Sequence, residues 1–407
     1  MESIKDNKNT KSKTKSVKSQ TDWLKTLEIS NAANEDLKEI WEILLTSYTL
    51  KVSRKRGKRN ENKNELVKGK IIFANNSKAT KTKSHFDNQI TYEDLQKILL
   101  QKRAEKGKLD QKNRTKENAE VFTPLWVCNK QNDLVDQEWF CKKSDLFLAE
   151  NNEQLLLLLD KEGWEKYQEY ILLPRMEITC GEAPYLVSRY DVTDSNLQIN
   201  PINSRIGLLD RKLRIINHFI AKENKDEWIK WVTKAFQSIY GFEYQGDNLL
   251  LARINLFNTF CDYYKDKFNQ DPSILNDKKL LIEVAKIISW NLWQMDGIEY
   301  CVPYSNNKSS KKEVAEDNGA FNEDWNDKIA KAFNNHQKED DQNSAQFCII
   351  KDWFLGKHPK DNKNSDFTDN LDNTLYFKNF MNTKDKLKAD ELKQVGKLSL
   401  VVSTDNN

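Results

Sequence analysis

Glu177-Ile-Thr-Cys-Gly-Glu-Ala-Pro-Tyr-Leu186 is a short apolar run that ends in a turn of small residues. We expect a strand over 176–180, then the turn, then a helix. In a parallel α/β sheet such a turn lies at the carboxyl edge, where the helix N-terminus presents free backbone N–H groups to a ligand. Gly181 and Ala183 are small enough for a ligand to approach the backbone. The same pattern also suits an ordinary tight turn, so the segment alone favours neither a nucleotide-like site nor a structural role.

The composition bounds the class of protein. The chain has 407 residues, of which 31% are charged and 38% hydrophobic, so it can bury a sizeable core but also contains solvated tails or loops. It has no apolar run of about 18 residues and no signal-peptide core, so we expect a cytoplasmic protein that does not enter a membrane. The six cysteines form no Cys-x-x-Cys pair, which indicates reduced thiols and no structural zinc.

Positive charge is concentrated near the N-terminus, although the net charge is only +3. The first twenty residues are rich in Lys, Ser, Thr and Asn, and we expect them to be disordered. A helical pattern follows over 23–50, and then a basic run, Lys51-Val-Ser-Arg-Lys-Arg-Gly-Lys-Arg59, continues through Lys83. This run is either a solvated loop or a patch that neutralises phosphates without base specificity.

A second segment, Ala119-Glu-Val-Phe-Thr-Pro-Leu-Trp-Val127, contains a turn followed by a helix that we expect over 126–134. Pro124 has the fixed φ angle that suits the start of a helix. The turn could also close over a pocket, to which Phe122 would give an aromatic wall and Thr123 a hydroxyl group. An ordinary helix that begins at a proline is the simpler interpretation of these residues.

A third segment extends over 239–256. We expect a helix over 227–238, a strand over Ile239–Glu243 and a helix over 247–260 whose buried face carries Leu250, Leu251, Ile254 and Phe257. Glu243 then ends the second strand, where an acidic residue can accept two hydrogen bonds from a ribose diol. The alternative is a carboxylate that pairs with a neighbouring lysine.

A fourth segment, Ile287-Ile-Ser-Trp-Asn-Leu-Trp-Gln-Met-Asp-Gly297, follows a helix expected over 278–286. It has the apolar pattern of a strand and places Asn291, then Asp296, beyond the end of that strand. Either side chain could hydrogen-bond a bound purine. Its two tryptophans are as compatible with the core as with a ligand wall.

Between the first and third segments, a long insertion over 188–225 holds arginines that face either an anionic partner or ion-paired neighbours; these are Arg189, Arg205, Arg211 and Arg214.

In this order the four segments resemble the S-adenosylmethionine-dependent N6-adenine DNA methyltransferases of bacterial restriction–modification systems, including proteins labelled as modification subunits. Segment 119–124 resembles their cofactor-closing Phe-Thr-Pro segment. Segment 177–186 is similar to their first motif, Asp-Pro-Ala-Cys-Gly-Ser-Gly-x-Phe-Leu, with Ala183 in place of the second Gly. Segment 239–256 is similar to Ile-Tyr-Gly-x-Asp followed by Ala-Arg-x-Asn-Leu, and Asn291 has the Asn position of the third motif, Gly-Asn-x-Leu. The resemblance covers about half of the chain, roughly 114–303.

The resemblance implies a Rossmann-like, doubly wound α/β methyltransferase sheet with a helical, partly disordered basic N-terminal region. It divides the chain into that region (1–110), an S-adenosylmethionine-binding core (111–303, with the insertion 188–225), a low-complexity linker (304–345) and an incomplete C-terminal extension (346–407). Gly181 and its turn would receive the methionine end of the cofactor, Glu177 its ammonium and Glu243 its ribose diol. The expected cofactor-binding residues are Phe122, Thr123, Pro124, Glu177, Cys180, Gly181, Ala183, Glu243, Tyr244, Asn291 and Asp296.

The catalytic loop of that family, Asn or Asp-Pro-Pro-Tyr or Phe, does not occur in the sequence. In the family it binds the adenine amine and stacks on the flipped base. Asn200-Pro-Ile-Asn203 begins similarly but lies in the insertion and lacks the aromatic residue. We therefore expect no catalytic residue in this chain: either a second polypeptide supplies the loop and the target recognition, or the gene is interrupted and its product inactive. No metal is needed, because the sulfonium carries its own leaving group.

The expected partners are double-stranded DNA and, in addition, the second polypeptide or a restriction endonuclease subunit. A non-catalytic DNA-binding or scaffolding subunit with a vestigial methyltransferase fold is the alternative, and a fused nuclease ranks last. The methyltransferase hypothesis requires that Gly181, Glu243 and Asn291 meet at one edge of a single sheet.

Overall fold

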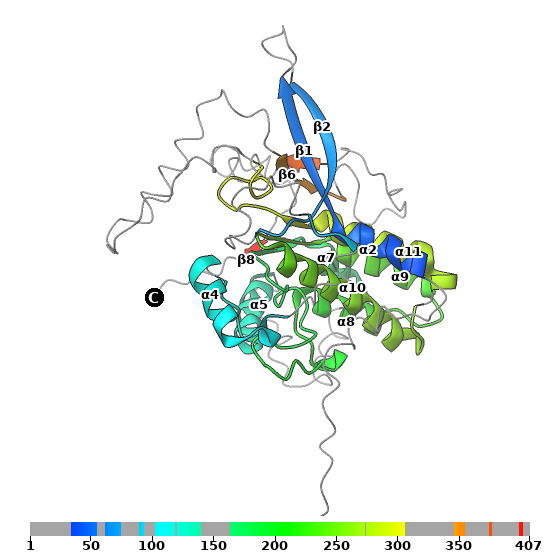
Figure 1. Cartoon of the computed structure of the whole chain (residues 1–407). Helices are drawn as coiled ribbons and strands as arrows, with labels where there is room; N and C mark the ends of the chain where they lie inside the picture. The colour runs from blue at the N-terminus through cyan, green and yellow to red at the C-terminus, as the bar shows by residue number, and fades with distance from the viewer. Residues whose placement is uncertain are drawn as a thin grey trace, which may run out of the picture.

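The computed structural model describes residues 34–54, 62–74, 89–92, 102–118, 120–139, 163–272, 274–305, 346–354, 374–376 and 399–401. Expectations about the first twenty residues and about the low-complexity linker therefore lie outside the described residues, apart from the start of that linker. The described chain is a mixed α/β structure with two sheets (Figure 1).

The parallel sheet contains the strand ends on which the sequence interpretation depends. Its strands are β3 (Arg175–Ile178), β4 (Ile239–Glu243), β5 (Leu292–Gln294) and β8 (Ser399–Val401), in the order β5-β4-β3-β8. All three pairings are parallel. The strand predicted over Ile239–Glu243 is confirmed, and β3 ends two residues before the predicted end. Because β4 and β8 flank β3 on opposite sides, the strand order reverses at β3.

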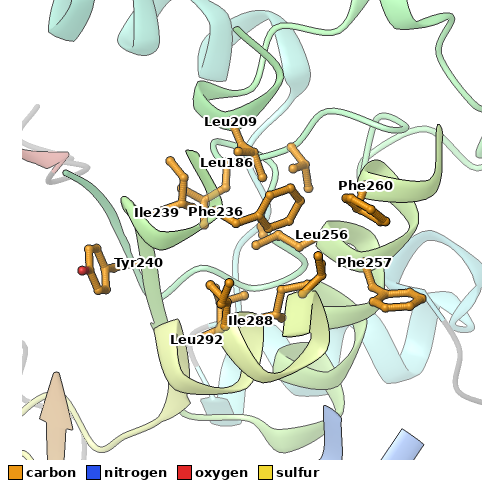
Figure 2. Packing of buried hydrophobic residues seen from close by; sticks show 14 of the residues in the cluster. Leu186, Leu209, Phe236, Ile239, Tyr240, Leu256, Phe257, Phe260, Ile288 and Leu292 are labelled. Carbon is orange, nitrogen blue, oxygen red and sulfur yellow. The ribbon is translucent and has the colours of Figure 1, made fainter. Parts of the chain in front are cut away.

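Helices pack around this sheet and enclose the core. They are α7 (Trp164–Leu172), α8 (Leu208–Phe219), α9 (Lys225–Gln237), α10 (Gly246–Phe268) and α11 (Ile274–Asn291). The helices predicted over 227–238 and 247–260 are confirmed as α9 and α10, and α10 continues to Phe268. Its predicted buried face is at most 2% exposed. Figure 2 shows Leu186, Leu209, Phe236 and Leu256 close together in this core, with Tyr240 pointing away from them.

A single turn, not a long helix, follows β3. The turn forms at Ala183, whose carbonyl accepts the N–H of Val187 at 2.9 Å. Residues 188–207 then form an excursion away from this turn, and α8 begins after it. The first N–H groups of α8 donate to the carbonyls of Tyr185 (2.8 Å) and Leu186 (2.9 Å). The helix expected after the turn is therefore only a single turn, and the insertion expected from residue 188 begins with this excursion and ends where α8 starts.

Close backbone packing lets α8 continue from that turn. A Cβ on Gly207 would lie 2.4 Å from the carbonyl oxygen of Leu186, so only glycine fits there. The region predicted as a surface insertion over 188–225 thus contains a core helix, since Leu208, Leu209 and Leu213 are fully buried. The excursion itself includes the short 3-10 helix η4 (Ile202–Ser204).

Ion pairs account for the arginines of this region. Arg189 and Arg205 both bond to Asp262, at 2.8 and 2.7 Å. Arg211 bonds to Asp133 and Asp136. Arg214 donates to the carbonyl of Asn203. Three of the four arginines are thus ion-paired, as the second of the two interpretations proposes.

The antiparallel sheet is formed by β1 (Thr46–Arg54), β2 (Asn62–Lys70), β6 (Gln346–Lys351) and β7 (Thr374–Tyr376), in the order β2-β1-β6-β7. Helix α2 (Asn34–Leu45) precedes it. The helix predicted over 23–50 therefore ends at Leu45. Thr46, Tyr48 and Thr49 favour a strand, and the Tyr48 ring stacks on Trp290 with centroids 4.2 Å apart. The basic run thus begins on β1 and includes β2, and its residues 55–61 and 75–83 lie outside the described ones.

Three further helices lie before β3: the short 3-10 helix η2 (Arg103–Glu105), α4 (Lys108–Asn118) and α5 (Leu125–Trp139). The helix predicted after Pro124 is confirmed as α5, which is five residues longer than expected at its end. Across the described residues, no helix combines the length and the apolar character that a bilayer-spanning segment needs.

Candidate functional site at the carboxyl end of β3

A small cavity of about 70 Å³ lies at the carboxyl end of β3. Two segments that are far apart in the sequence line it: residues 121–123 before α5, and the end of β3 with its turn. Five of the predicted site residues are in this lining, namely Phe122, Thr123, Glu177, Cys180 and Gly181. The sequence interpretation that the Phe-Thr-Pro turn closes over the first strand end is thus consistent with the geometry. Pro124 lies beside the lining, where its carbonyl accepts the first N–H bonds of α5.

The turn after β3 has a strained backbone. Thr179, Gly181 and Ala183 have φ angles of 51°, 52° and 64°, all in the left-handed region. This conformation is easy for glycine but costs about 1–2 kcal/mol for Thr or Ala. Backbone strain of this kind gathers at ligand sites, which makes the turn a candidate for function.

The Phe122 ring covers Gly181. A Cβ added to Gly181 would lie 3.2 Å from Phe122 Cε1, so the ring is seated directly against the glycine. The guanidinium of Arg103 lies 5.0 Å from the centroid of the same ring. Phe122 therefore closes the cavity on the side where a ligand would approach the backbone of the turn.

Glu243 joins the ends of β3 and β4. Its carboxylate accepts the N–H of Gly181 at 2.8 Å and that of Gln245 at 3.0 Å. An ionised carboxylate can accept about four hydrogen bonds, so two sites on its oxygens remain for a ligand. Burial raises the pKa of Glu243 to about 7, the nearby carboxylates of Glu120 and Asp247 add to the shift, and the two backbone bonds oppose it.

The raised pKa of Glu243 predicts a pH-dependent stability. Between its ordinary value of 4.5 and about 7, the folded chain holds the proton more tightly than the unfolded chain, so the free energy of unfolding falls as the pH rises. From pH 5 to pH 8 this contribution is about 2–3 kcal/mol. The variant Glu243→Gln lacks it, so urea unfolding should show the variant gaining about 2–3 kcal/mol on the wild type over this range. A difference that stays constant with pH would contradict the assignment.

Glu177 fixes the turn to β3. Its carboxylate accepts the N–H of Leu186 at 3.2 Å and that of Tyr185 at 3.5 Å. It is only 4% exposed, and burial raises its pKa well above the ordinary range. Glu177 also lines the cavity. Its role as the acceptor of an ammonium group stays a prediction.

Cys180 and Ala183 support the turn from inside. Both are buried, at 1% and 0% exposure. The N–H of Cys180 donates to the carbonyl of Phe242 on β4, and burial raises the pKa of its thiol well above the ordinary value. Cys180 therefore stays an uncharged thiol at neutral pH.

Tyr244 and Asp296 lie at the carboxyl ends of β4 and β5, outside the cavity lining. The Tyr244 ring meets Tyr304 edge-on with centroids 6.4 Å apart. Asp296 accepts the backbone N–H groups of Ile298 and Glu299, so it stabilises its own loop. Both residues are at the expected edge, but neither joins the cluster around Gly181.

Asn291 lies elsewhere, and the expectation that it follows its strand is wrong. It is the last residue of α11, immediately before β5. Its amide donates to the carbonyls of Phe236 and Ile239, and its oxygen accepts the Trp353 indole N–H at 2.8 Å. It thus sits at the amino end of β4. The expected convergence holds for Gly181 and Glu243 and fails for Asn291. The condition that all three residues meet at one edge is therefore not met, and any function proposed for this site depends on Gly181 and Glu243 without Asn291.

The physical reason for this error is a short apolar run that suits two structures. Residues 287–290 continue the buried face of α11, and only three residues form β5. Trp290 and Trp293 are 1% and 2% exposed, so both tryptophans lie in the core, which was one of the two interpretations of them. Periodicity alone cannot separate a buried helix end from a buried strand.

Sequence reasoning missed an ionic network that holds the Phe122 segment in place. Glu120 accepts bonds from Arg103 (3.1 Å) and Arg114 (2.5 Å). Arg114 and Lys106 also pair with Asp247, in the first turn of α10. Glu182, in the turn after β3, accepts the backbone N–H of Arg103 at 2.6 Å. The partners lie up to 141 positions apart, so no local pattern in the sequence could reveal them.

Comparison of the chain with protein-family models, with curated proteins and with solved structures found no match. Within the described ranges, no group of three or more His, Cys, Asp or Glu side chains is arranged to hold a metal ion. The resemblance in the order of the segments therefore remains a prediction, and the site has to be judged on its geometry.

Proposed function

We propose that the cavity at the end of β3 binds S-adenosylmethionine and that the chain is the cofactor-binding part of a DNA adenine-N6 methyltransferase of a restriction–modification system. The sheet would be the cofactor half of a Rossmann-like, doubly wound fold. One observation carries the proposal: the bond between Gly181 and Glu243 lies where the strand order reverses at β3. In open α/β sheets, ligands bind outside the carboxyl ends of the strands at such a switch point.

The chemistry of the lining and of Glu243 behind it suits this cofactor. In the lining, Glu177 offers a buried carboxylate for an ammonium group and the Phe122 ring an aromatic face for a cation. Glu243 is not in the lining but bonds to the N–H of Gly181, which is, and would offer acceptor sites for a ribose diol. The cavity is small and Phe122 is seated directly against Gly181, so we expect Phe122 to move away from Gly181 when the whole cofactor binds. Thr123 and Pro124 would move with it.

The bound cofactor would supply an activated methyl group on a sulfonium. The residues of this chain would bind and orient the cofactor, and such positioning of the reacting groups is the main contribution of the protein to lowering the barrier of this transfer. Acceptance of the adenine amine requires a catalytic loop that the sequence lacks. The proposal therefore includes a second polypeptide that supplies that loop; without it the chain alone would be inactive.

Isothermal titration of the purified chain with S-adenosylmethionine tests the proposal. We expect heat of binding, and a loss of about 1.5–3 kcal/mol of binding free energy in Glu243→Ala, since the diol would lose charge-assisted hydrogen bonds. This corresponds to about 10- to 150-fold weaker affinity. Asp271→Ala is the matched control, because Asp271 is 59% exposed and pairs with Lys265. Absence of heat with the wild-type chain would contradict cofactor binding, and equal affinity in Glu243→Ala would remove that residue from the site.

A second function is a non-catalytic DNA-binding or scaffolding subunit with a vestigial methyltransferase fold. The closed position of Phe122 over Gly181 and the missing catalytic loop favour it. In that case the titration gives no heat, and the affinity for duplex DNA is the same with and without the cofactor.

A further inference from the structure

The most prominent feature that the cavity does not explain is the two-stranded ribbon of β1 and β2. The strands pair antiparallel over nine residues each, from Thr46 opposite Lys70 to Arg54 opposite Asn62. At about 3.3 Å per residue the ribbon is about 30 Å long. Strand β6 pairs with β1 only at positions 49–51. Figure 1 shows the rest of the ribbon projecting away from the helices.

The segment that forms this ribbon has a strong excess of positive charge. Residues 46–70 contain nine Lys or Arg and two Glu, a net charge of +7. The whole chain has a net charge of +3, so all other residues together have a net charge of −4. Five of the nine basic residues are on the strands themselves, at Lys51, Arg54, Lys63, Lys68 and Lys70. Such asymmetry indicates a surface for a polyanion.

The base of the ribbon is firmly anchored. Tyr48 stacks on Trp290 of α11 with an interplanar angle of 8°. Arg253 of α10 donates to the carbonyls of Leu44 and Thr46. Lys70 pairs with Glu42 of α2 at 2.5 Å. An isolated two-stranded ribbon is only marginally stable, so these bonds are what let it extend from the protein.

The ribbon also rises from the edge that carries the cavity. Ile72, two residues after β2, exchanges two hydrogen bonds with the Gln294 side chain at the carboxyl end of β5. Gln294 also donates to the carbonyl of Tyr244, which follows Glu243. The backbone is packed so closely that a Cβ on Gly246 would lie 2.1 Å from the Ile72 oxygen. A chain of direct contacts therefore joins the ribbon base to the cavity.

We propose that the β1–β2 ribbon is an arm that binds the phosphate backbone of duplex DNA and holds the duplex beside the carboxyl edge of the parallel sheet. The choice of DNA rests on the proposed methyltransferase function. A two-stranded antiparallel ribbon fits the major groove, which is about 12 Å wide. Basic residues on both strands would contact phosphates, which gives affinity without sequence specificity.

Fluorescence anisotropy of the full chain with a labelled duplex of about 20 base pairs, over a range of salt concentrations, tests this arm. Each lost phosphate contact lowers the slope of log affinity against log salt by about 0.9. The triple variant Lys51→Gln, Arg54→Gln, Lys63→Gln should therefore lower the slope by up to about 2.7. The matched control makes the same charge change at exposed lysines elsewhere: Lys222→Gln, Lys265→Gln, Lys279→Gln. It should leave the slope close to the wild-type value.

A second variant separates charge from folding. Lys51→Arg, Arg54→Lys, Lys63→Arg keeps the three charges and should keep the slope, whereas a folding defect caused by substitution would lower it too. An unchanged slope in the Gln variant would overturn the proposal, and so would equal effects of the Gln variant and its control. Tighter binding of single-stranded DNA, or binding only of an acidic protein such as a polyglutamate probe, would overturn the assignment to duplex DNA.

Cofactor titration distinguishes this proposal from the proposed function. The Gln variant of the ribbon should bind S-adenosylmethionine as the wild type does, because none of its three positions lines the cavity. If the wild-type chain gives no cofactor heat but the salt slope falls in the variant, the methyltransferase function fails and the arm stands. If cofactor binds and the slope does not change, the arm fails alone.

Discussion

Replacement of Arg253 by methionine is expected to lower the free energy of unfolding by about 3–5 kcal/mol. Arg253 lies on α10 and is fully buried. Its guanidinium donates to four backbone carbonyls, those of Leu44, Thr46, Ser289 and Leu292. These carbonyls belong to the end of α2, the start of β1, the end of α11 and the start of β5. One side chain therefore holds the ribbon base and the parallel sheet together.

Two opposing effects decide the size of this loss. Burial lowers the pKa of Arg253 to about 9, so the buried charge is itself costly, although the group stays protonated at neutral pH. Methionine removes that cost but leaves the four carbonyls without this donor. A hydrogen bond from a charged donor contributes about 1.5–3 kcal/mol, so the lost bonds outweigh the relieved charge. Arg253→Lys keeps the charge but has a single nitrogen that cannot reach all four oxygens, and it should be intermediate.

Urea unfolding followed by circular dichroism measures this effect. Arg214→Met is the matched control: Arg214 is on α8, only partly buried, and donates to the single carbonyl of Asn203. We expect it to lose no more than about 1 kcal/mol. A loss of less than 1 kcal/mol in Arg253→Met would mean that the carbonyls find other donors, and the assigned role of Arg253 would then be wrong.

The strand ends at the cavity could be predicted from the sequence because their signals are local. The strand Ile239–Glu243 is an apolar run between an amphipathic helix and the next helix start, and its last residue is acidic. Gly181 follows another short apolar run. In a parallel sheet, two such ends must lie at one edge, so the meeting of Gly181 with Glu243 follows from the topology.

The parts that could not be predicted depend on long-range contacts. The spacing of the segments predicts an insertion from residue 188, but it does not predict that α8 ends it at Leu208, because α8 continues the earlier turn through bonds to Tyr185 and Leu186, not through the chain itself. The β1–β2 ribbon was missed because its basic residues have the composition of a loop, and only the stacking of Tyr48 on Trp290 and the pairing with β2 fix it as a strand. The error at Asn291 has a different source, a run of apolar residues that suits both a helix end and a strand.

Replacement of Asp136 by asparagine is expected to cost about 3–5 kcal/mol of folding free energy. Asp136 lies on α5 and is fully buried. Its carboxylate accepts bonds from Arg175 on β3 (3.2 Å), Arg211 on α8 (2.8 Å) and the Tyr170 hydroxyl on α7 (2.9 Å). An amide at this position lacks the charge and presents an NH₂ group to at least one of these donors. Both guanidinium groups would then stay buried without their full counter-charge.

The neighbouring Asp133 provides the control for this prediction. It is 18% exposed and accepts a bond from Arg211 alone, at 2.7 Å. Asp133→Asn should therefore cost about 1 kcal/mol or less. Equal losses in the two variants, measured by urea unfolding, would show that the charge of Asp136 is not what binds α5 to the sheet.

The Asp136 bonds also bear on the candidate site, because α5 begins directly after the Phe122-Thr123-Pro124 turn. Two sets of contacts can therefore hold Phe122 over Gly181: the ionic network around Glu120, and the attachment of α5 to β3 and α8 through Asp136, which we expect to contribute. In the fraction of Asp136→Asn that is folded, the affinity for S-adenosylmethionine should therefore change as well, whereas Asp133→Asn should bind as the wild type does. A stability loss in Asp136→Asn without any change in affinity would separate the anchoring of α5 from the closure of the cavity, and Phe122 would then owe its position to the bonds of Arg103 and Glu120 instead.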